Sequence, residues 1–395
     1  MSTFSIWRCP LQVQLKLIRR GTVCFPGEQC REMDLLIAGN RIGMVEEGIE
    51  PPKGLDVAIF DAANSYVIPG LIDLHVHLIG GGGESGPSSL IPEISLPTLT
   101  TAAITTVVGV LGTDAIARTP EALLTKVKGL RKEGLSAYMY TGAYHFPSPT
   151  ITGSVTRDIA LIDEIIGVKI AISDHRCSQP TLHELARLAS EARVGGMLGG
   201  KPGLVHVHVG RGKEGLGPIF SVIKETEVPI LQFLPTHISR NSSLLEQGIE
   251  FVERGGAIDL TAPSDPEKAI RIVRTLLENR VDLSRITFSS DGNGSKPRFD
   301  SEGRLVEMRV GEVSGLIRTL RHLVRSKTLP LPQALTLFTS NPAARLGLHK
   351  KKGCIRPGAD ADLVLLDEDL HVDKVFARGR LLVDRGEPVA KGELE

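Results

Sequence analysis

The feature that most constrains the fold is an alternation between short apolar, β-branched segments and helical patterns in the middle of the chain. Eight such apolar segments occupy residues 67–78, 103–112, 135–145, 167–174, 203–210, 228–237, 256–263 and 285–292. Most are separated by stretches of helical periodicity, for which we expect Thr181, Ser242 and Asp265 as N-cap residues. Strands separated by helices indicate parallel β/α units, and eight strands are the number that closes a (β/α)8 TIM barrel.

The two ends of the chain have a different pattern. Short alternating segments broken by Gly or Asn fill about the first 60 residues and return in GADADLVLLDEDLHVDKVFARGRLLVDRGEPV near the C-terminus. We therefore expect an α/β protein with a (β/α)8 barrel over residues 67–346. Residues 1–66 and 347–395 are expected to form one small β-sandwich domain built from both termini.

Composition excludes several classes of protein. The 46 Lys and Arg residues balance 46 Asp and Glu residues, so no net charge favours a nucleic-acid partner. No uninterrupted apolar run reaches the length of about 18 residues typical of a transmembrane helix, and the N-terminal MSTFSIWRCPLQVQLKLIRR lacks the apolar core of a signal peptide. The five cysteines are an odd number without a C-x-x-C pair, which is typical of free thiols in a reducing compartment. We expect a cytoplasmic protein with no membrane partner.

Histidines and one aspartate fall at corresponding places on the predicted strands. His75 and His77 are two residues apart in LIDLHVHL, so on a strand both imidazoles point to one face. The alternative, a polar pair on a solvated face, is disfavoured by the buried character of the surrounding segment. His208, His237 and Asp291 end the fifth, sixth and eighth segments, and a parallel barrel collects these ends at one mouth. Four imidazoles and a carboxylate suit zinc or a similar divalent ion, and are enough for two.

Lys169 lies inside the fourth apolar segment, GVKIAISD. An ammonium ion is costly to bury in an apolar strand. The side chain could extend to solvent unmodified. It could instead be carbamylated by carbon dioxide, which would turn the cation into a carboxylate able to bridge two metal ions. The residues alone leave both readings open.

Four consecutive glycines, residues 80–83 in GGGGESGP, directly follow the first barrel segment. Glycines cost entropy to order, so a functional reason is expected. They could let the backbone approach a ligand closely, or act as a hinge for a segment over the mouth. A plain flexible linker is disfavoured because an active-site βα loop belongs at this place.

Longer motifs accompany these residues: HVHLIGGGGESGP, VVGVLGTD, TGAYHFPSPTITGSV, GVKIAISDHR, RVGGMLGGKPG, LPTHISRN and SSDGNGS. With them the chain resembles the amidohydrolase superfamily over essentially its whole length, and more closely the isoaspartyl (β-aspartyl) dipeptidase family. H-x-H alone marks only the superfamily, whereas GGGGESGP, TGAYH, SDHR and SSDGNGS are more specific. Arg211 departs from the family pattern, in which an acidic residue is expected.

The resemblance implies a binuclear zinc centre. The first zinc ion would be held by His75, His77 and Asp291, the second by His208 and His237. Lys169, carbamylated with carbon dioxide or bicarbonate, would bridge them. A hydroxide between the metals would be the nucleophile, since bound metal lowers the pKa of water. Asp291 would act as general base and acid, and the phenol of Tyr144 would stabilise the oxyanion.

The resemblance also implies a substrate site for β-aspartyl dipeptides. Glu84 would pair with the substrate ammonium, and Arg176 and Arg240 would bind its carboxylates through planar forks. Further contacts are implied for Gly82, Thr113, Tyr144 and Ser295. For Glu84 and the arginines the alternative is a solvated loop charge, and for Tyr144 a packing aromatic.

Three functions are weighed. The first is a metallodipeptidase for β-aspartyl bonds. The second is a cyclic amide hydrolase of the dihydroorotase or hydantoinase type, in which Glu84 would have no ammonium to bind. The third, a scaffold that has lost its metals, is disfavoured because all expected ligands are present. A homo-oligomer, an octamer by resemblance, is expected. The remaining histidines, including His206 and His175, are expected to be structural or exposed.

Overall fold

The computed structural model describes residues 14–392 except 301 and 303, and omits the side chains of residues 297, 299 and 305. Cys9 and most of the N-terminal stretch in which no signal peptide was expected lie outside these residues. Within the described part of the chain, no helix is long and apolar enough to cross a membrane.

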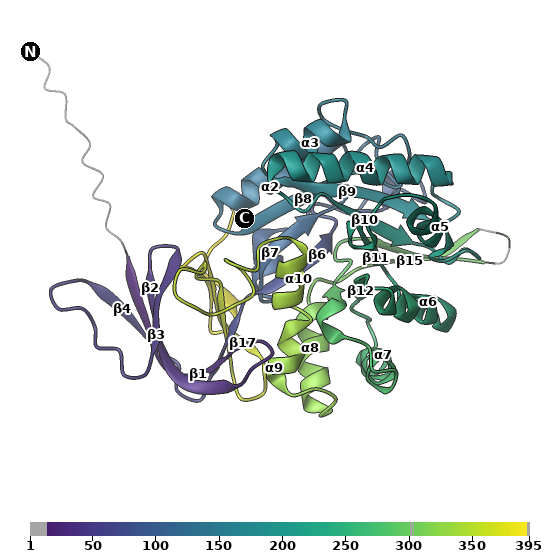
Figure 1. Cartoon of the computed structure of the whole chain (residues 1–395). Coiled ribbons are helices and arrows are strands. Elements are labelled where there is room, and N and C mark those ends of the chain that lie inside the picture. The colour runs from purple at the N-terminus through teal and green to yellow at the C-terminus, as the bar shows by residue number, and fades with distance from the viewer. Residues whose placement is uncertain (1–13, 301, 303, 393–395) are drawn as a thin grey trace, which may run out of the picture.

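Eight parallel strands form the expected barrel (Figure 1). They are β6 (Leu71–Val76), β7 (Ile104–Gly109), β8 (Ser136–Gly142), β9 (Ile165–Ile172), β10 (Leu204–Val209), β11 (Phe233–Thr236), β12 (Ile258–Thr261) and β13 (Ile286–Ser289). The first six pair in chain order and β12 pairs with β13. The ring closes where the His77 N–H donates to the Gly292 carbonyl at 2.9 Å and where β11 lies beside β12. All eight strands correspond to the predicted apolar segments.

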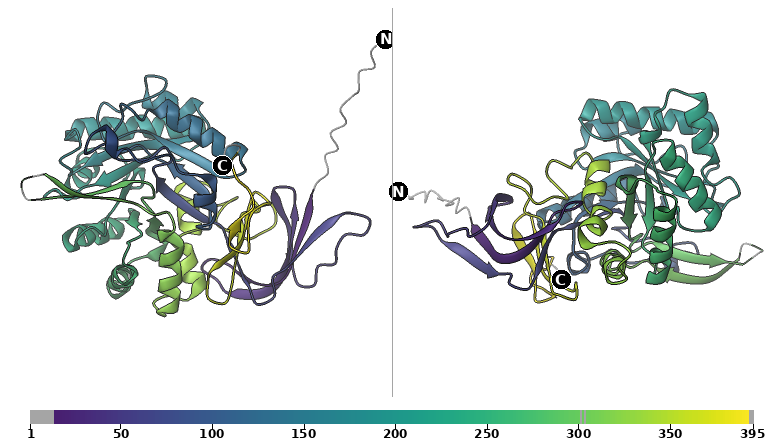
Figure 2. Two further views of the ribbon diagram at one scale, coloured as in Figure 1. Left: turned by 180° about the vertical axis from the view of Figure 1, so that it is seen from behind. Right: turned by 60° about the horizontal axis from the view of Figure 1, so that its bottom comes forward.

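Helices cover the outside of the barrel, as Figure 2 shows from two further directions. They are α1 (Leu96–Thr100), α2 (Pro120–Lys132), α3 (Val155–Leu161), α4 (Leu182–Gly199), α5 (Gly217–Glu225), α6 (Ser242–Glu253), α7 (Pro266–Glu278), α8 (Gly315–Arg325), α9 (Leu331–Thr336) and α10 (Ser340–Arg345), with short 3-10 turns at Pro87–Ser89, Ile230–Gln232 and Leu283–Arg285. Thr181 and Asp265 cap α4 and α7 as expected. For α6 the prediction was one residue late, because the side chain of Asn241 accepts the Leu244 N–H and makes Asn241 the cap.

Strands from both termini join in a second sheet of nine strands. Its members are β1 (Leu15–Cys24), β2 (Cys30–Ala38), β3 (Arg41–Glu46), β4 (Val57–Asp61), β5 (Tyr66–Pro69), β16 (Leu363–Leu366), β17 (Val372–Ala377), β18 (Arg380–Asp384) and β19 (Glu387–Pro388). The N-terminal and C-terminal parts of this sheet are joined by the antiparallel pairing of β5 with β16. In Figure 1 the N-terminal strands are purple and the C-terminal strands are yellow. We propose residues 1–66 with 347–395, against 67–346, as the domain division.

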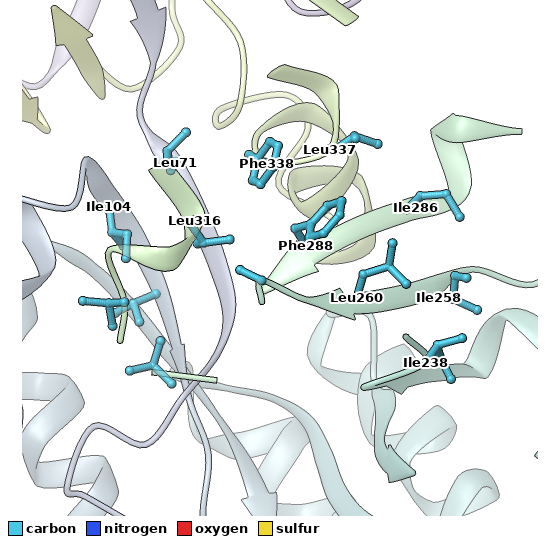
Figure 3. Close-up of a cluster of buried hydrophobic side chains, with 14 of the residues drawn as sticks. Leu71, Ile104, Ile238, Ile258, Leu260, Ile286, Phe288, Leu316, Leu337 and Phe338 are labelled. Atoms are coloured by element: carbon cyan, nitrogen blue, oxygen red, sulfur yellow. The ribbon is translucent and has the colours of Figure 1, made fainter. Parts of the chain in front are cut away.

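Apolar side chains fill the layer between the barrel strands and the surrounding helices, part of which Figure 3 shows. Phe288 of β13 stacks on Phe338, which follows α9, with ring centroids 5.1 Å apart, and both are fully buried. Leu71, Leu260 and Leu316 from β6, β12 and α8 belong to the same buried cluster. The residues that alternate with Leu260 and Phe288 on these strands face the inside of the barrel, where polar side chains gather.

The cysteines differ from the expectation of free thiols. Cys24 and Cys30 form a disulfide, because they stand directly opposite each other where β1 pairs with β2. A search for C-x-x-C spacing misses a pair joined across a hairpin. Cys177 and Cys354 are free. The disulfide removes one of the observations behind the cytoplasmic expectation, which otherwise rests on the absence of a signal-peptide core and of a long apolar run in the sequence.

Candidate active site

The structure places the predicted metal ligands at the carboxyl ends of the barrel strands. His75 lies in β6, with His77 directly after it. His208 is in β10, His237 follows β11, and Asp291 is two residues beyond β13. All five are buried. The β/α phase of the sequence therefore predicted the position of each residue along its strand.

Three of these residues converge on one point. The ligand atoms of His75, His77 and Asp291 all lie within 4.8 Å of one another. Nε2 of each histidine is 3.5 Å from Oδ1 of Asp291. Two imidazoles and a carboxylate are a donor set that suits zinc and similar divalent ions.

The residues fit a metal in three further respects. Burial, with the Lys169 ammonium close by, holds the pKa of His75 well below its ordinary 6.5, so the ring is neutral and keeps a lone pair. Nδ1 of His77 is buried without a hydrogen-bond partner in the described structure. A Cβ on Gly294 would stand 2.7 Å from Oδ1 of Asp291 and 2.8 Å from Cδ2 of His77. The glycine leaves the space in which these two side chains meet.

Lys169 lies under this group. Its side chain is fully buried in β9, and Nζ is 3.2 Å from Nε2 of His75. Burial lowers the pKa of Lys169 to about 7, although the carboxylates of Asp291 and Asp259 act in the opposite direction. The amine is thus substantially neutral near neutral pH. The alternative in which the unmodified Lys169 side chain extends to solvent is wrong, because the side chain is fully buried.

His208 is engaged at both ring nitrogens. Burial, together with the nearby Arg240 guanidinium, holds the pKa of His208 well below its ordinary value, so the ring is neutral. Nε2 lies 3.0 Å from Oδ2 of Asp174, and Nδ1 lies 2.6 Å from the phenol oxygen of Tyr144. The carboxylate can only accept, so Nε2 donates to Asp174 and the Tyr144 hydroxyl donates to Nδ1. His208 can offer Nδ1 to a metal only after Tyr144 turns away.

His237 stands beside His75 and His208, with ring centroids 5.0 Å and 4.6 Å away. Nδ1 of His237 lies 2.6 Å from Oγ1 of Thr261. His237 and Asp291 both have left-handed backbone angles, with φ of 65° and 54°. Such non-glycine conformations cost free energy and gather at functional sites. The structure thus brings His208 and His237 next to the convergent group but not into it.

The predicted substrate residues meet on the other side of the mouth. Oε1 of Glu84 accepts from Ser295 Oγ at 2.6 Å and from Arg176 Nη1 at 3.2 Å. Arg176 also donates through Nε and Nη2 to the two oxygens of Asp174, at 2.9 Å and 2.8 Å. Its guanidinium lies 5.4 Å from the centroid of the Tyr144 ring. Glu84, Ser295 and the Asp174–Arg176 pair, from three separate parts of the chain, are therefore held in one charged network.

A cavity of about 670 Å³ opens above these groups. The predicted Gly82 and Thr113 line it, as do Arg240 and Arg211. A Cβ on Gly82, whose φ is 93°, would stand 2.2 Å from the Ser89 carbonyl oxygen. The glycine run therefore lets the loop fold back closely on itself beside the cavity.

Sequence reasoning missed three residues of the site. His206, expected to be structural, is fully buried with Nε2 3.0 Å from Nδ1 of His75, and it stacks on Tyr140. Its position in H-x-H with His208 was the available signal. His175 is exposed, as expected, and it also lines the cavity. Asp174 was not singled out, although hydrogen bonds from His208 and Arg176 outweigh its burial and hold its pKa well below the usual range.

Comparison with known proteins agrees with this geometry. A family model described as the amidohydrolase family matches residues 66–382, and the chain belongs to that family. Within it, the chain is 44% identical to the β-aspartyl dipeptidase from Fervidobacterium islandicum AW-1, whose structure was solved in complex with β-Asp-Leu. That match covers 95% of this chain and 98% of the other, with a TM-score of 0.89. A second structure of the β-aspartyl dipeptidase from this source is 42% identical over the same shares, with a TM-score of 0.86.

Other relatives are more distant or match over a shorter range. A D-hydantoinase structure matches with 18% identity and a TM-score of 0.66 over 95% of this chain and 97% of the other, which shows a shared fold. The dihydroorotase of Staphylococcus aureus (strain MRSA252) is 44% identical over 70 residues, 18% of this chain. That match spans only 16% of the curated relative's own length.

Proposed function

We propose that this protein is a metal-dependent dipeptidase that hydrolyses the β-aspartyl peptide bond. The observation that carries the proposal is the placement of Glu84, Arg176 and Ser295 in one network beside the His75, His77 and Asp291 group. A β-aspartyl dipeptide offers an ammonium and two carboxylates, which these charges match. The 44% identity to a β-aspartyl dipeptidase over 95% of the chain supports the same reaction.

The proposed cofactor is a pair of zinc ions. His75, His77 and Asp291 would hold one ion and His208 with His237 the other. When bound, the metals would lower the pKa of a water molecule towards about 7 and polarise the scissile carbonyl. Everything else in the reaction falls to the side chains around them.

Lys169 is proposed to be carbamylated and to bridge the two ions. Its amine, with a pKa of about 7, is nucleophilic near neutral pH. The nitrogen lone pair would attack carbon dioxide to form an N–C bond, and one proton would be released, giving a carbamate of charge −1. The carbamate would place a negative charge beside the metal ions, whose charge would offset the cost of burying it.

Glu84 and the arginines would orient the substrate. Glu84 would accept hydrogen bonds from the α-ammonium of the aspartyl residue. Arg176, already fixed by Asp174, would hold one carboxylate, and Arg240 the other. The guanidinium of Arg240 lines the cavity and makes no hydrogen bond or ion pair within the described residues. It is thus free to receive a substrate carboxylate through two parallel N–H groups.

Asp291 and Tyr144 would move and stabilise charge. Asp291 would take the proton of the attacking water and deliver it to the leaving amine, because its carboxylate lines the cavity and lies 3.5 Å from Nε2 of both His75 and His77. Burial raises the pKa of Tyr144, so its phenol keeps its proton and can donate to the developing oxyanion. If His208 held a metal ion through Nδ1, the Tyr144 hydroxyl would be free for that role.

Replacing Glu84 by glutamine tests the substrate class. Loss of a charged hydrogen bond should reduce kcat/KM for β-Asp-Leu by about 10–100-fold. Glu93→Gln is the matched control, because Glu93 pairs with Lys126 and its side chain is 58% exposed. The short dihydroorotase match makes a cyclic amide hydrolase the second candidate. Hydrolysis of dihydroorotate or a hydantoin by the wild type, with no cleavage of β-Asp-Leu, would replace the dipeptidase by this alternative.

Assembly and location are also proposals. We propose a homo-oligomer, an octamer as the resemblance implies, and a cytoplasmic location. Light scattering on the purified chain would give the assembled mass, and a mass of one chain would refute the first of these. Fractionation of the source cells would decide the second.

A further inference from the structure

Cations are distributed unevenly around the cavity. On the side formed by the loops after β6 and β9, Arg176 is paired with Glu84 and Asp174. On the side formed by the loops after β10, β11 and β12, Arg211, Arg240 and Lys268 line the cavity without an ion pair among the described residues. This second group is called the basic side here.

The carboxylate nearest the basic side does not neutralise it. Asp265 caps α7, accepting the Glu267 N–H at 3.0 Å, and pairs with Arg271 at 3.4 Å. Burial, followed by the nearby charges of Arg211, Arg271 and Arg240, lowers the pKa of Lys268, and the opposing effect of Asp265 is smaller. Arg211 and Lys268 both line the cavity, so an anion bound between them would be attracted by both cations.

The basic side also has room beyond a dipeptide backbone. A second cavity of about 280 Å³ shares Ser239, Arg240 and Lys268 with the main cavity. It continues between α6 and α7, where Leu245 and Ile272 line it. The two cavities together leave space for a substrate side chain beside Arg240 and Lys268.

The charged groups of a β-aspartyl dipeptide are too few to pair with all of these cations. Its ammonium is matched by Glu84, and its two carboxylates by Arg176 and Arg240. Arg211 and Lys268 then face no backbone charge of the substrate. We propose that they form a subsite for a side-chain carboxylate on the second residue, so that β-aspartyl dipeptides ending in glutamate or aspartate are preferred. The inference rests on the proposed dipeptidase function.

The test compares two substrates of nearly equal shape, β-Asp-Glu and β-Asp-Gln, with the purified holoenzyme. Because Arg211 is exposed, we expect a modest ratio of kcat/KM, about 2–5-fold in favour of glutamate at low ionic strength. The ratio should shrink at about 0.5 M salt, where the screening length is only a few ångströms. In the double variant Arg211→Gln/Lys268→Gln it should fall to about 1.

Within each variant the ratio cancels any general loss of activity, and thermal unfolding checks the fold. Arg187→Gln is the control, since Arg187 pairs with Glu191 on the exposed face of α4 and should leave the ratio unchanged. Equal hydrolysis of the two substrates by the wild type, or an unchanged ratio in the double variant, overturns the subsite. Absence of hydrolysis of β-Asp-Gln and β-Asp-Leu alike would instead refute the dipeptidase itself, and the subsite with it.

Discussion

Replacing Lys352 by methionine should destabilise the protein far more than its place in a run of three lysines suggests. Lys352 is only 4% exposed, whereas Lys351 beside it is exposed. Its Nζ lies 2.5 Å from Oδ2 of Asp362, 2.7 Å from Oδ2 of Asp360 and 2.5 Å from Oγ of Ser136 in β8. The ammonium therefore joins the barrel to the segment that leads into the terminal sheet.

The size of the loss in unfolding free energy follows from the carboxylates that Lys352→Met leaves without their partner. Asp360 would keep its ion pair with Arg41, but Asp362 is 5% exposed and would retain only the Arg378 N–H. Removing one partner of a buried ion pair costs about 3–5 kcal/mol, because the other charge is left uncompensated. At 1.4 kcal/mol per factor of ten, the unfolding equilibrium shifts by roughly a hundredfold to a few thousandfold.

Urea unfolding followed by circular dichroism measures the change. Lys351→Met is the matched control and should cost less than about 0.5 kcal/mol, as surface substitutions do. In an Asp362→Asn background, Lys352→Met should cost less than in the wild type, because that carboxylate is gone. A loss no larger for Lys352→Met than for Lys351→Met would refute the reasoning.

Three further outcomes are expected. Burial alone would lower the pKa of Lys352, but Asp362 and Asp360 outweigh this effect and raise the pKa above 10.5. The stabilisation of the fold by the Lys352 ammonium is therefore complete below pH 10.5 and is lost as the pH rises through the folded-state pKa. The free energies of unfolding of the wild type and Lys352→Met should converge only at that alkaline end. His206→Phe should weaken zinc affinity about 10–100-fold in chelator competition, because the hydrogen bond from His206 to His75 orients the His75 ring. His206→Gln should lose less affinity. Equal zinc affinity of both variants and the wild type would contradict this role of His206. Gly294→Ala should also weaken zinc binding, since the added Cβ displaces Asp291 or His77; Gly129→Ala, in an open position of α2, should not, and equal zinc affinity of Gly294→Ala and the wild type would argue against the crowding.

Much of the fold could be predicted because strand and helix periods are local properties of the sequence. The eight apolar segments predicted the eight barrel strands, and the ends of these segments predicted that His75, His208 and Asp291 lie at the carboxyl end of the barrel. The pairing of β5 with β16 joins residues about 300 positions apart, yet the similar texture of both termini was enough to expect it. The Cys24–Cys30 disulfide was not predicted, since it depends on the register of a hairpin.

The site was predictable only where a residue's position along a strand determines its role. Lys169 and the histidines satisfied that condition. The tautomer of His208 did not, because it depends on Asp174 and Tyr144, which come from two other loops. Likewise nothing local distinguishes Lys352 from the two lysines before it. The tautomer of His208 and the role of Lys352 both depend on burial and on neighbouring side chains, which only tertiary packing determines.

The central claim is a metal-dependent activity on β-aspartyl bonds, and hydrolysis of β-Asp-Leu beside α-Asp-Leu tests it most directly. Purified protein would be supplied with zinc and bicarbonate, then stripped with a chelator and reconstituted. The account predicts cleavage of the β isomer alone, lost on stripping and restored by zinc. Cleavage of both isomers at equal rates, or of neither with zinc bound, would contradict it.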